Sequence, residues 1–276
     1  MSQRGFTLIE MAMVFVLIGL MVGGGLFALA PVIDKSRMNQ TSATLDQVEN
    51  ALELFAIRYS RLPCPADGSL AATDPNYGLE QPAGGATTCT ITGATDAKAV
   101  IPWRTLGIDE SYSIDAWATR LSYWPSGSVT GSTTLTTGTP LTHTGSTFPT
   151  SSGTYMTVVD VVSGKSITPL PPPATTSGDQ AAYVLVSHGK SRWYGWSKNG
   201  VLQPALRVTA NKACNSSPNN CALGTTLSTP APASFASGGP VGSYPPSSGT
   251  YFDDIIRWRS PAMIIQLCGS GSCGNS

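Results

Sequence analysis

The sequence is poor in charged residues and in the side chains on which most enzymes depend. Only 12% of its 276 residues are charged, and its two histidines are His143 and His188. Sixteen basic and sixteen acidic side chains balance to a formal net charge of zero. This balance gives no indication of a nucleic-acid surface or of an acidic tail. No nucleic-acid partner is therefore predicted.

Motifs typical of catalysis are also missing. The chain has no Gly-x-Ser-x-Gly, no His-Glu-x-x-His, no phosphate-binding loop and no dinucleotide fingerprint. His188 follows a predicted strand and precedes Gly189, which favours a histidine in a turn over a catalytic one. We therefore expect a protein that is not an enzyme.

The six cysteines lack the Cys-x-x-Cys spacing of a zinc site, and neither histidine lies near a pair. An even number of cysteines beyond an apolar N-terminal segment indicates disulfides formed in an oxidising compartment. The sequence alone does not fix the connectivity. We predict that neighbours pair, because each pair brackets a turn-like segment: Cys64 with Cys89, Cys214 with Cys221, and Cys268 with Cys273.

Near its start the chain carries a long uncharged run. From Met11 to Ile33 no residue is charged, and a helix needs ~20 apolar residues to span a bilayer. Glu10 stands at the head of the run, where an unpaired carboxylate in lipid would be unfavourable. Pro31 lacks a backbone donor and should kink or loosen the helix. The run predicts a membrane-spanning helix with one acid that needs a partner.

The residues before this run, Arg4-Gly-Phe-Thr-Leu-Ile-Glu10, resemble the processing site of type IV prepilins and type II secretion pseudopilins. The resemblance implies that residues 1–5 are a leader peptide and that a prepilin peptidase cleaves after Gly5. It also implies methylation of the new amine on Phe6. Glu10 of one subunit would then neutralise that amine on its neighbour, which would set the register of assembly, because a buried carboxylate needs a partner.

The same resemblance implies the layout of the chain. Residues 6–33 would form the transmembrane and filament-core helix, residues 34–61 its amphipathic continuation, and residues 62–276 a periplasmic head. The expected fold is α+β and pilin-like: a long N-terminal helix packed on a small antiparallel sheet, with loop insertions and disulfides. The protein would sit in the bacterial inner membrane with a single pass and then join a filament, which could reach the cell surface.

The partners implied are a prepilin peptidase, other pilin or pseudopilin subunits, an inner-membrane assembly platform and the lipid bilayer. Because bulky insertions would hinder dense packing, a minor pilin or minor pseudopilin is favoured over a major one. Pilus and secretion systems are not distinguished. The alternative is a membrane-tethered or filament-tip binding module, for which Trp193 and Trp196 would be exposed contact residues.

Other interpretations of the N-terminus remain open. Ala28-Leu-Ala30 matches the small-x-small site of a secretory signal, but Pro31 would follow the cut and the apolar run is long for such a signal. An unprocessed membrane anchor is a second alternative. Thr7 and Glu10 also have the spacing of a capping box, in which the two side chains satisfy free helix amides. A cap and a role in assembly can coexist.

The orientation of the span rests on the cysteines. Arg4 precedes the run, whereas Lys35 and Arg37 follow it, and a count of basic residues mildly favours the opposite direction. The cysteines require an oxidising compartment for the C-terminal part. We therefore place the N-terminus in the cytoplasm, in agreement with the family resemblance.

An amphipathic pattern follows the apolar run. Its apolar residues recur at steps of three and four, which predicts one buried helical face ending near Ser60; they are Leu45, Val48, Leu52, Phe55 and Tyr59. Residues 66–100 are rich in Gly, Ala, Thr and Asp and predict an irregular connector closed by the first cysteine pair.

Several later segments have the composition of strands. The strands expected in the sheet are residues 120–124, 155–162, 182–187, 251–258 and 263–267. Asn199-Gly200 predicts a hairpin turn between residues 193–196 and 201–202. Residues 126–153 and 209–249 are dominated by Ser, Thr, Gly and Pro, and we expect them to be surface loops.

One metal hypothesis comes from the resemblance. The segment Asp115-Ala-Trp-Ala118 is similar to the Asp-Pro-Trp-Gly segment of major pseudopilins, and those proteins bind calcium through acids in a C-terminal loop. Asp115, Asp253 and Asp254 could supply oxygen ligands, of which calcium takes about 6–8. Their spacing matches no known calcium loop, and turn or capping aspartates are the alternative. No other cofactor is expected.

Overall fold

The computed structural model describes residues 7–27, 29–59, 61–81, 89, 98–125, 157–160, 167, 181–193, 195–203, 234–237 and 253–267. The chain divides into two compact units, residues 1–40 and 41–276, and each is described by itself. The predicted pairs Cys214–Cys221 and Cys268–Cys273 lie outside the described residues, as do Gly5, Phe6 and the predicted loop 126–153.

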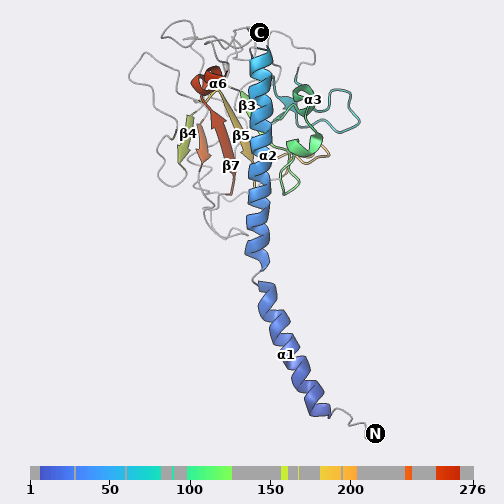
Figure 1. Cartoon of the computed structure of the whole chain (residues 1–276). Helices are drawn as coiled ribbons and strands as arrows, with labels where there is room; N and C mark the ends of the chain where they lie inside the picture. Colours follow the sequence, from blue (N-terminus) through green and yellow to red (C-terminus); the bar gives the residue numbers. More distant parts are fainter. Residues whose placement is uncertain are drawn as a thin grey trace. The chain divides into compact units, whose positions relative to one another are not determined.

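Two helices begin the chain, α1 (Leu8–Phe27) and α2 (Leu29–Tyr59) (Figure 1). Pro31 is the third residue of α2, so it does not interrupt that helix. In the first turn its missing N–H is one that a helix leaves unpaired in any case. The expected interruption of the N-terminal helix lies just before Pro31 instead, because α1 ends at Phe27, the residue whose carbonyl the proline ring would meet in a continuous helix, and α2 begins at Leu29. The amphipathic pattern predicted the end of α2, near Ser60, correctly.

The head contains a five-stranded sheet in which all neighbouring strands are antiparallel, in the order β1-β2-β3-β5-β7. An N-terminal helix with an antiparallel sheet confirms the α+β class. The strands are β1 (Ala66–Asp67), β2 (Ala99–Val100), β3 (Ser122–Pro125), β5 (Tyr183–Ser187) and β7 (Ile255–Arg259).

The second half of α2 lies across one face of this sheet (Figure 1). Leu45, Val48 and Leu52 are fully buried and share one apolar cluster with Tyr183 and Leu185 of β5. The period of the apolar residues in α2 explains the contact, since these side chains project from one face of the helix. The predicted packing of the helix on a sheet is confirmed.

The opposite face of the sheet is buried as well. Val184 and Val186 of β5 join Trp124 and Ile256 in a second cluster, which also contains Val158. All five residues of β5 are therefore buried. A strand that is covered on both faces carries a continuous apolar run rather than an alternating one, which explains the sequence Tyr-Val-Leu-Val.

Ion pairs also join α2 to β7. Arg259 Nη1 lies 3.2 Å from Glu49 Oε1, and Arg259 Nε lies 3.2 Å from Glu53 Oε1. Arg257 donates to Ser42 Oγ at 2.6 Å and lies 3.8 Å from Asp46. Burial raises the pKa of Glu49, and the charge of Arg259 opposes this effect. These polar contacts lie beside the apolar face and orient the helix on the sheet.

The expectation of a strand at residues 263–267 is wrong, because Pro261–Leu267 forms helix α6. Ser260 precedes it, and its side-chain oxygen accepts a hydrogen bond from Met263 N at 3.4 Å. Proline is favoured at the first helical position, where no N–H is needed. A short apolar run by itself does not distinguish a strand from a helix. The Ser-Pro pair in front of the run is a helix-start signal, and the prediction of a strand did not take it into account.

Residues 157–160 do form a strand, β4 (Thr157–Asp160), but not in the main sheet. β4 pairs in parallel with β6 (Ser234–Ser237), which lies inside the predicted surface loop 209–249. That interpretation is wrong for β6. Its residues, Ser-Phe-Ala-Ser, include a single large apolar side chain, so the hydrophobic pattern gave little indication of a strand.

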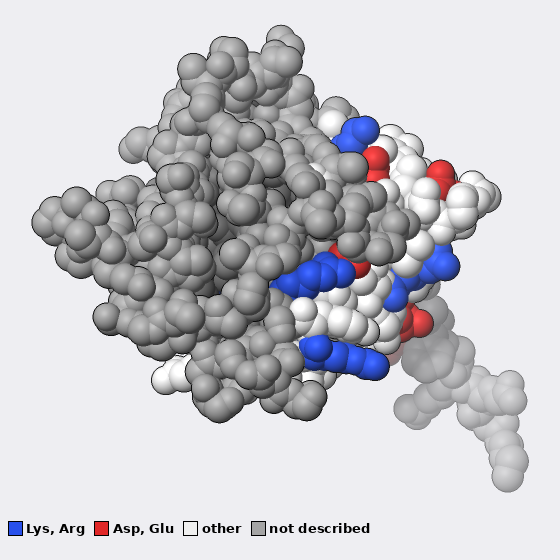
Figure 2. Space-filling view, turned by 90° about the horizontal axis from the view of Figure 1, so that it is seen from above, with Lys and Arg blue, Asp and Glu red and all other residues white. Residues whose placement is uncertain are grey.

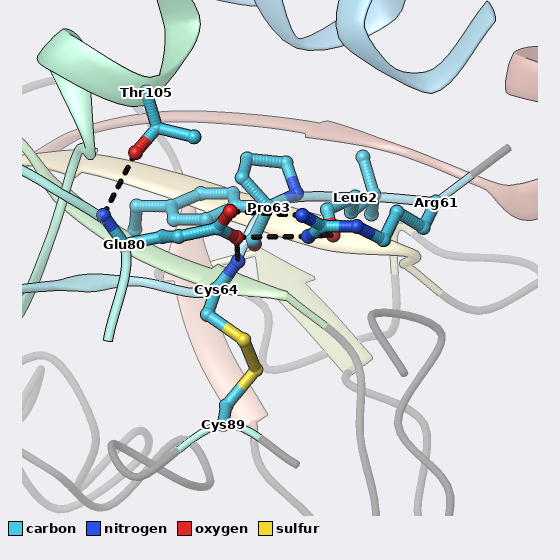
Figure 3. Close-up of polar contacts among 8 residues, drawn as sticks. Arg61, Leu62, Pro63, Cys64, Glu80, Cys89 and Thr105 are labelled. Carbon is cyan, nitrogen blue, oxygen red and sulfur yellow. Dashed lines mark hydrogen bonds and ion pairs between the residues drawn. A yellow bond between two sulfur atoms is a disulfide. The ribbon is translucent and has the colours of Figure 1, made fainter. Parts of the chain in front are cut away.

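The connector between residues 66 and 100 is more ordered than predicted, because its two ends pair as β1 and β2. The disulfide Cys64–Cys89 is present as predicted, with an S–S distance of 2.01 Å. Buried Glu80 lies beside it (Figure 3). Its carboxylate accepts two hydrogen bonds of 2.8 Å from Arg61 and one of 3.0 Å from Cys64 N.

Glu80 also links this region to helix α3 (Trp103–Leu106), because its backbone N–H donates to Thr105 Oγ1 at 2.8 Å (Figure 3). Glu80 therefore contacts Arg61, just beyond α2, through its carboxylate and contacts Thr105 of α3 through its backbone N–H. We infer that the disulfide and Glu80 together order this part of the connector.

Replacing Cys64 and Cys89 by serine should lower the free energy of unfolding by about 3 kcal/mol, because the open chain regains the entropy of a 25-residue loop. Denaturant unfolding of the oxidised parent and of the double variant, monitored by tryptophan fluorescence, measures this difference. Reduction of the parent should lower the free energy of unfolding by at least as much, because it opens this disulfide together with any that the other four cysteines form. Equal midpoints for parent and variant would contradict the prediction.

Candidate functional site

At the start of α1, Thr7 and Glu10 form the predicted capping box. The Glu10 carboxylate accepts hydrogen bonds from Thr7 N and from Thr7 Oγ1, both at 3.0 Å and both on Oε2. In return, Thr7 Oγ1 accepts one from Glu10 N at 3.4 Å. Each side chain satisfies an amide that the helix start would leave unpaired. The capping role of Glu10 is confirmed, and its role in assembly stays a prediction.

The helix that follows Glu10 exposes apolar side chains. From Leu8 to Leu20 every residue is exposed, with Leu8 at 90% and Phe15 at 66% of its surface. Soluble monomers rarely present a continuous apolar surface of this kind, which marks a site for protein or lipid contact. In the part of the chain that the structure describes, no helix has both the length and the hydropathy needed to cross a membrane.

In the head, the predicted Asp115 turn is a compact hydrogen-bonded unit. Asp115 Oδ1 accepts from Trp117 N and Thr119 N, each at 2.9 Å, and Asp115 Oδ2 accepts from Ser187 Oγ at 2.7 Å. Burial raises the pKa of Asp115 to about 6. Thr41 Oγ1 accepts from Ala116 N at 3.2 Å, which joins this turn to α2.

Ala118 occupies the position where the similar segment of pseudopilins has glycine. Its φ is +63°, in the left-handed region that residues with a Cβ rarely adopt. Its N–H donates to Asp115 O at 3.0 Å, so the turn requires this conformation. The resemblance of the sequence segment therefore extends to a backbone geometry that suits glycine better than alanine.

His188 lies directly after β5 and before a turn, as predicted, but it is fully buried. Its Nε2 lies 2.8 Å from Ser122 Oγ, and Ser122 is also fully buried. Burial lowers the pKa of His188 to about 4, so the ring is neutral at neutral pH. Because both side chains are fully buried, a substrate in solvent cannot reach this serine–histidine contact. The contact links β3 to the end of β5.

Two of the three acids in the calcium hypothesis lie near each other: burial is the main cause of the raised pKa of Asp115, and the charge of Asp253 adds to it. Asp115 accepts hydrogen bonds from its own turn and from Ser187 Oγ of β5. Asp253 accepts hydrogen bonds from Ser191 N at 2.6 Å and from Ser191 Oγ at 2.9 Å. The described residues contain no cluster of three or more His, Cys, Asp or Glu side chains able to hold a metal ion. Calcium binding stays a prediction that the structure does not test.

Sequence reasoning missed Arg120, which is buried at 4% exposure. Its guanidinium donates to the carbonyl oxygens of Gly68 at 2.8 Å, Leu70 at 2.9 Å and Lys198. It also lies over the ring of Tyr77, 4.7 Å from the centroid. Arg120 thus holds two distant segments of the head against β3. An arginine at the start of a predicted strand was the only sequence signal, and it did not identify the carbonyl partners.

Glu110, in the 3-10 helix η1 (Glu110–Ser113), extends this cluster. Tyr77 donates a hydrogen bond to Glu110, and Lys198 Nζ lies 3.4 Å from it. Across the face shown in Figure 2, Lys and Arg side chains are interspersed with Asp and Glu.

The interpretation of Trp196 as an exposed contact residue is wrong. Trp196 is 8% exposed and packs with Ala66 and Val100 in a small apolar cluster. Its backbone pairs with Leu202 across the turn at Gly200, whose φ is +73°. The predicted hairpin turn is confirmed, and the side chain that it holds stabilises the head. Trp193 is half-buried.

Comparison with known proteins gives one match. Residues 1–26 match the family model of the prokaryotic N-terminal methylation motif, which is the signal of type IV prepilins and pseudopilins. The motif indicates a subunit of the type IV pilin or pseudopilin kind. Searches of the curated proteins and of the solved structures found no match to the chain.

Replacing Asp115 by asparagine should change how stability depends on pH. The pKa of Asp115 is raised from 3.8 to about 6 in the folded chain, so its ionisation lowers stability as the pH rises from about 4 to 6. The titration of His188 has the opposite effect on stability, because its pKa is lowered from 6.5 to about 4 in the folded chain. The stability that the neutral imidazole contributes is lost as the pH falls from about 6.5 to 4.

In the parent these two contributions oppose each other between pH 4 and 6. The Asp115→Asn variant keeps the contribution of His188 and lacks that of Asp115. Relative to the parent, its free energy of unfolding should therefore fall by up to about 3 kcal/mol as the pH falls from 6.5 to 4. Denaturant unfolding of both proteins at several pH values measures the difference. Parallel stability–pH curves would show that Asp115 is ionised at its ordinary pKa.

Replacing Ala118 by glycine should stabilise the head by about 0.5–1 kcal/mol. Relief of the left-handed strain is worth about 1–2 kcal/mol, and the greater freedom of glycine in the unfolded chain offsets part of it. Ala116→Gly is the matched control, because the φ of Ala116 is not positive, and it should destabilise. Thermal unfolding measures both variants, and a loss of stability in both would refute the role assigned to Ala118.

Proposed function

We propose that this protein is a structural subunit, of the minor pilin or minor pseudopilin kind, of a type IV pilus or type II secretion filament. The methylation motif at residues 1–26 carries the proposal. A prepilin peptidase cleaves the chain between Gly5 and Phe6 and methylates the new amine. The subunit is anchored in the inner membrane by its N-terminal helix, with its head in the periplasm, before it joins the filament.

The exposed apolar residues of α1 support a role in the filament core. Burying a side chain such as Leu8 or Phe15 contributes about 1.5–3 kcal/mol relative to leaving it in water, and these side chains are exposed in the single chain. First the bilayer and then the helices of neighbouring subunits remove them from water. Assembly through this helix is a mechanical function that needs no catalytic group.

Glu10 gives the assembly its register in this proposal. In an apolar filament core an unpaired carboxylate is unfavourable, and a charge that pairs in only one axial position favours that position. The methylated amine of Phe6 on a neighbouring subunit is the pairing cation. The capping hydrogen bonds of Glu10 occupy Oε2, so a cap and an intersubunit pair use different oxygens.

The minor rather than major position follows from the size of the chain and from its long segments rich in Ser, Thr, Gly and Pro. A subunit that repeats along a filament packs most densely with a compact head. The alternative, a binding module at a filament tip, is less well supported, because Trp196, one of its two proposed contact residues, is buried.

Replacing Glu10 by glutamine should leave processing and membrane insertion intact and reduce incorporation into filaments by at least about tenfold, since the charge that pairs with the amine is lost. Sheared filaments and membranes from cells that express equal amounts of each protein are quantified by immunoblot. Gly5→Ala is the control for processing and should retain the leader. Normal incorporation of the Glu10→Gln variant would exclude the assembly role of this carboxylate.

A further inference from the structure

We propose that one end of the head is a bilayer-contact surface, at which Arg192 and Trp193 meet the phosphate-bearing headgroup region of a phospholipid membrane. This inference rests on the proposed anchoring of the chain in the inner membrane. It adds a lipid contact made by the head to the one made by the N-terminal helix, and it concerns the subunit before it joins a filament.

Two turns pack together at this end of the head, the Asp115 turn (residues 115–119) and the turn of residues 188–193, which follows β5. Gly195 lies between them, and a Cβ at that position would collide with Thr119 Cγ2 and with the ring of His188. This close packing leaves the two turns little freedom to move apart. Residues 115–119 and 188–193 therefore form one surface, which we call the entry surface.

The entry surface lies where the chain enters the head. Thr41 is the first residue of the unit that contains the head, and its Oγ1 accepts a hydrogen bond from Ala116 N at 3.2 Å. Thr41 follows Ile33, the last residue of the uncharged run, by eight positions. Eight residues reach at most ~29 Å even when fully extended. In any arrangement of the two units, Thr41 is thus tethered within that distance of the end of the proposed anchor.

The side chains of the entry surface suit the boundary between a bilayer and water. Arg192 is exposed, and Lys190 and Trp193 are half-buried. Arginine binds phosphate groups through two parallel N–H donors, and tryptophan is enriched where membranes meet water. Ala116 and Ala118 add small apolar groups, of which Ala118 is exposed. This combination of a cation, an aromatic ring and small apolar groups favours headgroups over a purely aqueous surrounding.

The acids at this end of the head are buried or bonded to the protein. Asp115 is 5% exposed. Both oxygens of Asp253 accept hydrogen bonds from Ser191, Oδ2 from its N–H and Oδ1 from its hydroxyl. Asp254 is half-buried. Arg192 is therefore the most accessible charge that the structure describes at this end, and it has the sign that phosphate groups attract.

The backbone of Arg192 indicates a role for its side chain outside the head. Its φ is +57°, in the left-handed region that residues with a Cβ rarely adopt. Arg192 N donates to His188 O at 3.0 Å and Gly195 N donates to Arg192 O at 3.1 Å, which hold this conformation. Glycine would adopt it with less strain. Strain of this kind is typical of functional sites, and in the described part of the chain the guanidinium of Arg192 forms no ion pair.

Tryptophan fluorescence tests the contact, because all six tryptophans lie in the head. The full chain is reconstituted in vesicles of phosphatidylethanolamine and phosphatidylglycerol, with or without phospholipid brominated near the headgroup. Bromine quenches only the tryptophans that it reaches. The brominated lipid should reduce the fluorescence of the parent by up to about one sixth, the share of one tryptophan in six. Trp193→Phe should abolish this quenching, and quenching that does not depend on Trp193 would overturn the inference.

A matched pair of variants tests the part of Arg192. Arg192→Gln should lower the quenched fraction by up to about fivefold, the effect of one basic side chain near a charged bilayer surface. Arg58→Gln removes the same charge about 25 Å further along α2 than Thr41, and it should leave the quenching unchanged. Equal quenching in the parent and in Arg192→Gln would contradict the role assigned to Arg192.

Flotation of the same vesicles separates this inference from the proposed function. If the chain floats with the vesicles but no quenching depends on Trp193, the proposed anchor stands and the lipid contact of the head is wrong. If the chain does not float with them, both fail. If quenching is absent and Arg192→Gln lowers incorporation into filaments, the entry surface binds a neighbouring subunit, and the lipid contact is again wrong.

A stability measurement tests the argument from strain without a membrane. Arg192→Gly should raise the thermal midpoint of the full chain in detergent by about 2 °C, because glycine relieves the left-handed backbone. In vesicles the same variant should lose quenching as Arg192→Gln does. A lower midpoint would show that the side chain of Arg192 stabilises the head itself and would contradict a role outside it.

Discussion

A row of apolar side chains exposed to water is the constraint on which the interpretation of this protein depends. Apart from Glu10, the described side chains of α1 from Leu8 to Leu20 are uncharged, and each of them is exposed. Hydrophobic burial is the dominant favourable term both in folding and in association. A surface of this kind therefore calls for a partner, and the methylation motif that overlaps it identifies the class of partner.

The head differs from α1, because most of its large apolar side chains that the structure describes are buried inside it. It buries apolar residues on both faces of the sheet, with Leu185 on the side of α2 and Val184 on the other. Several of its buried polar groups are linked into local networks around Asp115, Arg120 and Glu80. These networks hold the turns and connectors that the composition alone would leave loosely packed.

The N-terminal features and the helix of the head were predictable from sequence, because both depend on local spacing. Thr7 and Glu10 are three residues apart, and Leu45, Val48 and Leu52 follow the helical period. The Cys64–Cys89 pairing was also predictable as a pairing of neighbours. In each case the partners lie within reach of a short-range rule.

Contacts between distant segments were not predictable in this way. Arg120 binds the carbonyl oxygens of Gly68 and Lys198, and no pattern in a single sequence identifies which carbonyls a buried arginine will meet. Residues 263–267 were misassigned because a run of apolar residues suits a strand and a short helix equally well. β6 was missed because its pairing relies on backbone groups, which every residue carries.

The proposed class of protein requires a new N-terminal amine on Phe6, and no other interpretation of the N-terminus predicts one there. The mass of the mature N-terminal peptide, determined from protein extracted from its native membrane or filament, tests this most directly. A peptide that begins at methylated Phe6 is the expected result. A peptide that begins at Met1, as for an unprocessed anchor, or at Pro31, as for a secretory protein, would contradict it.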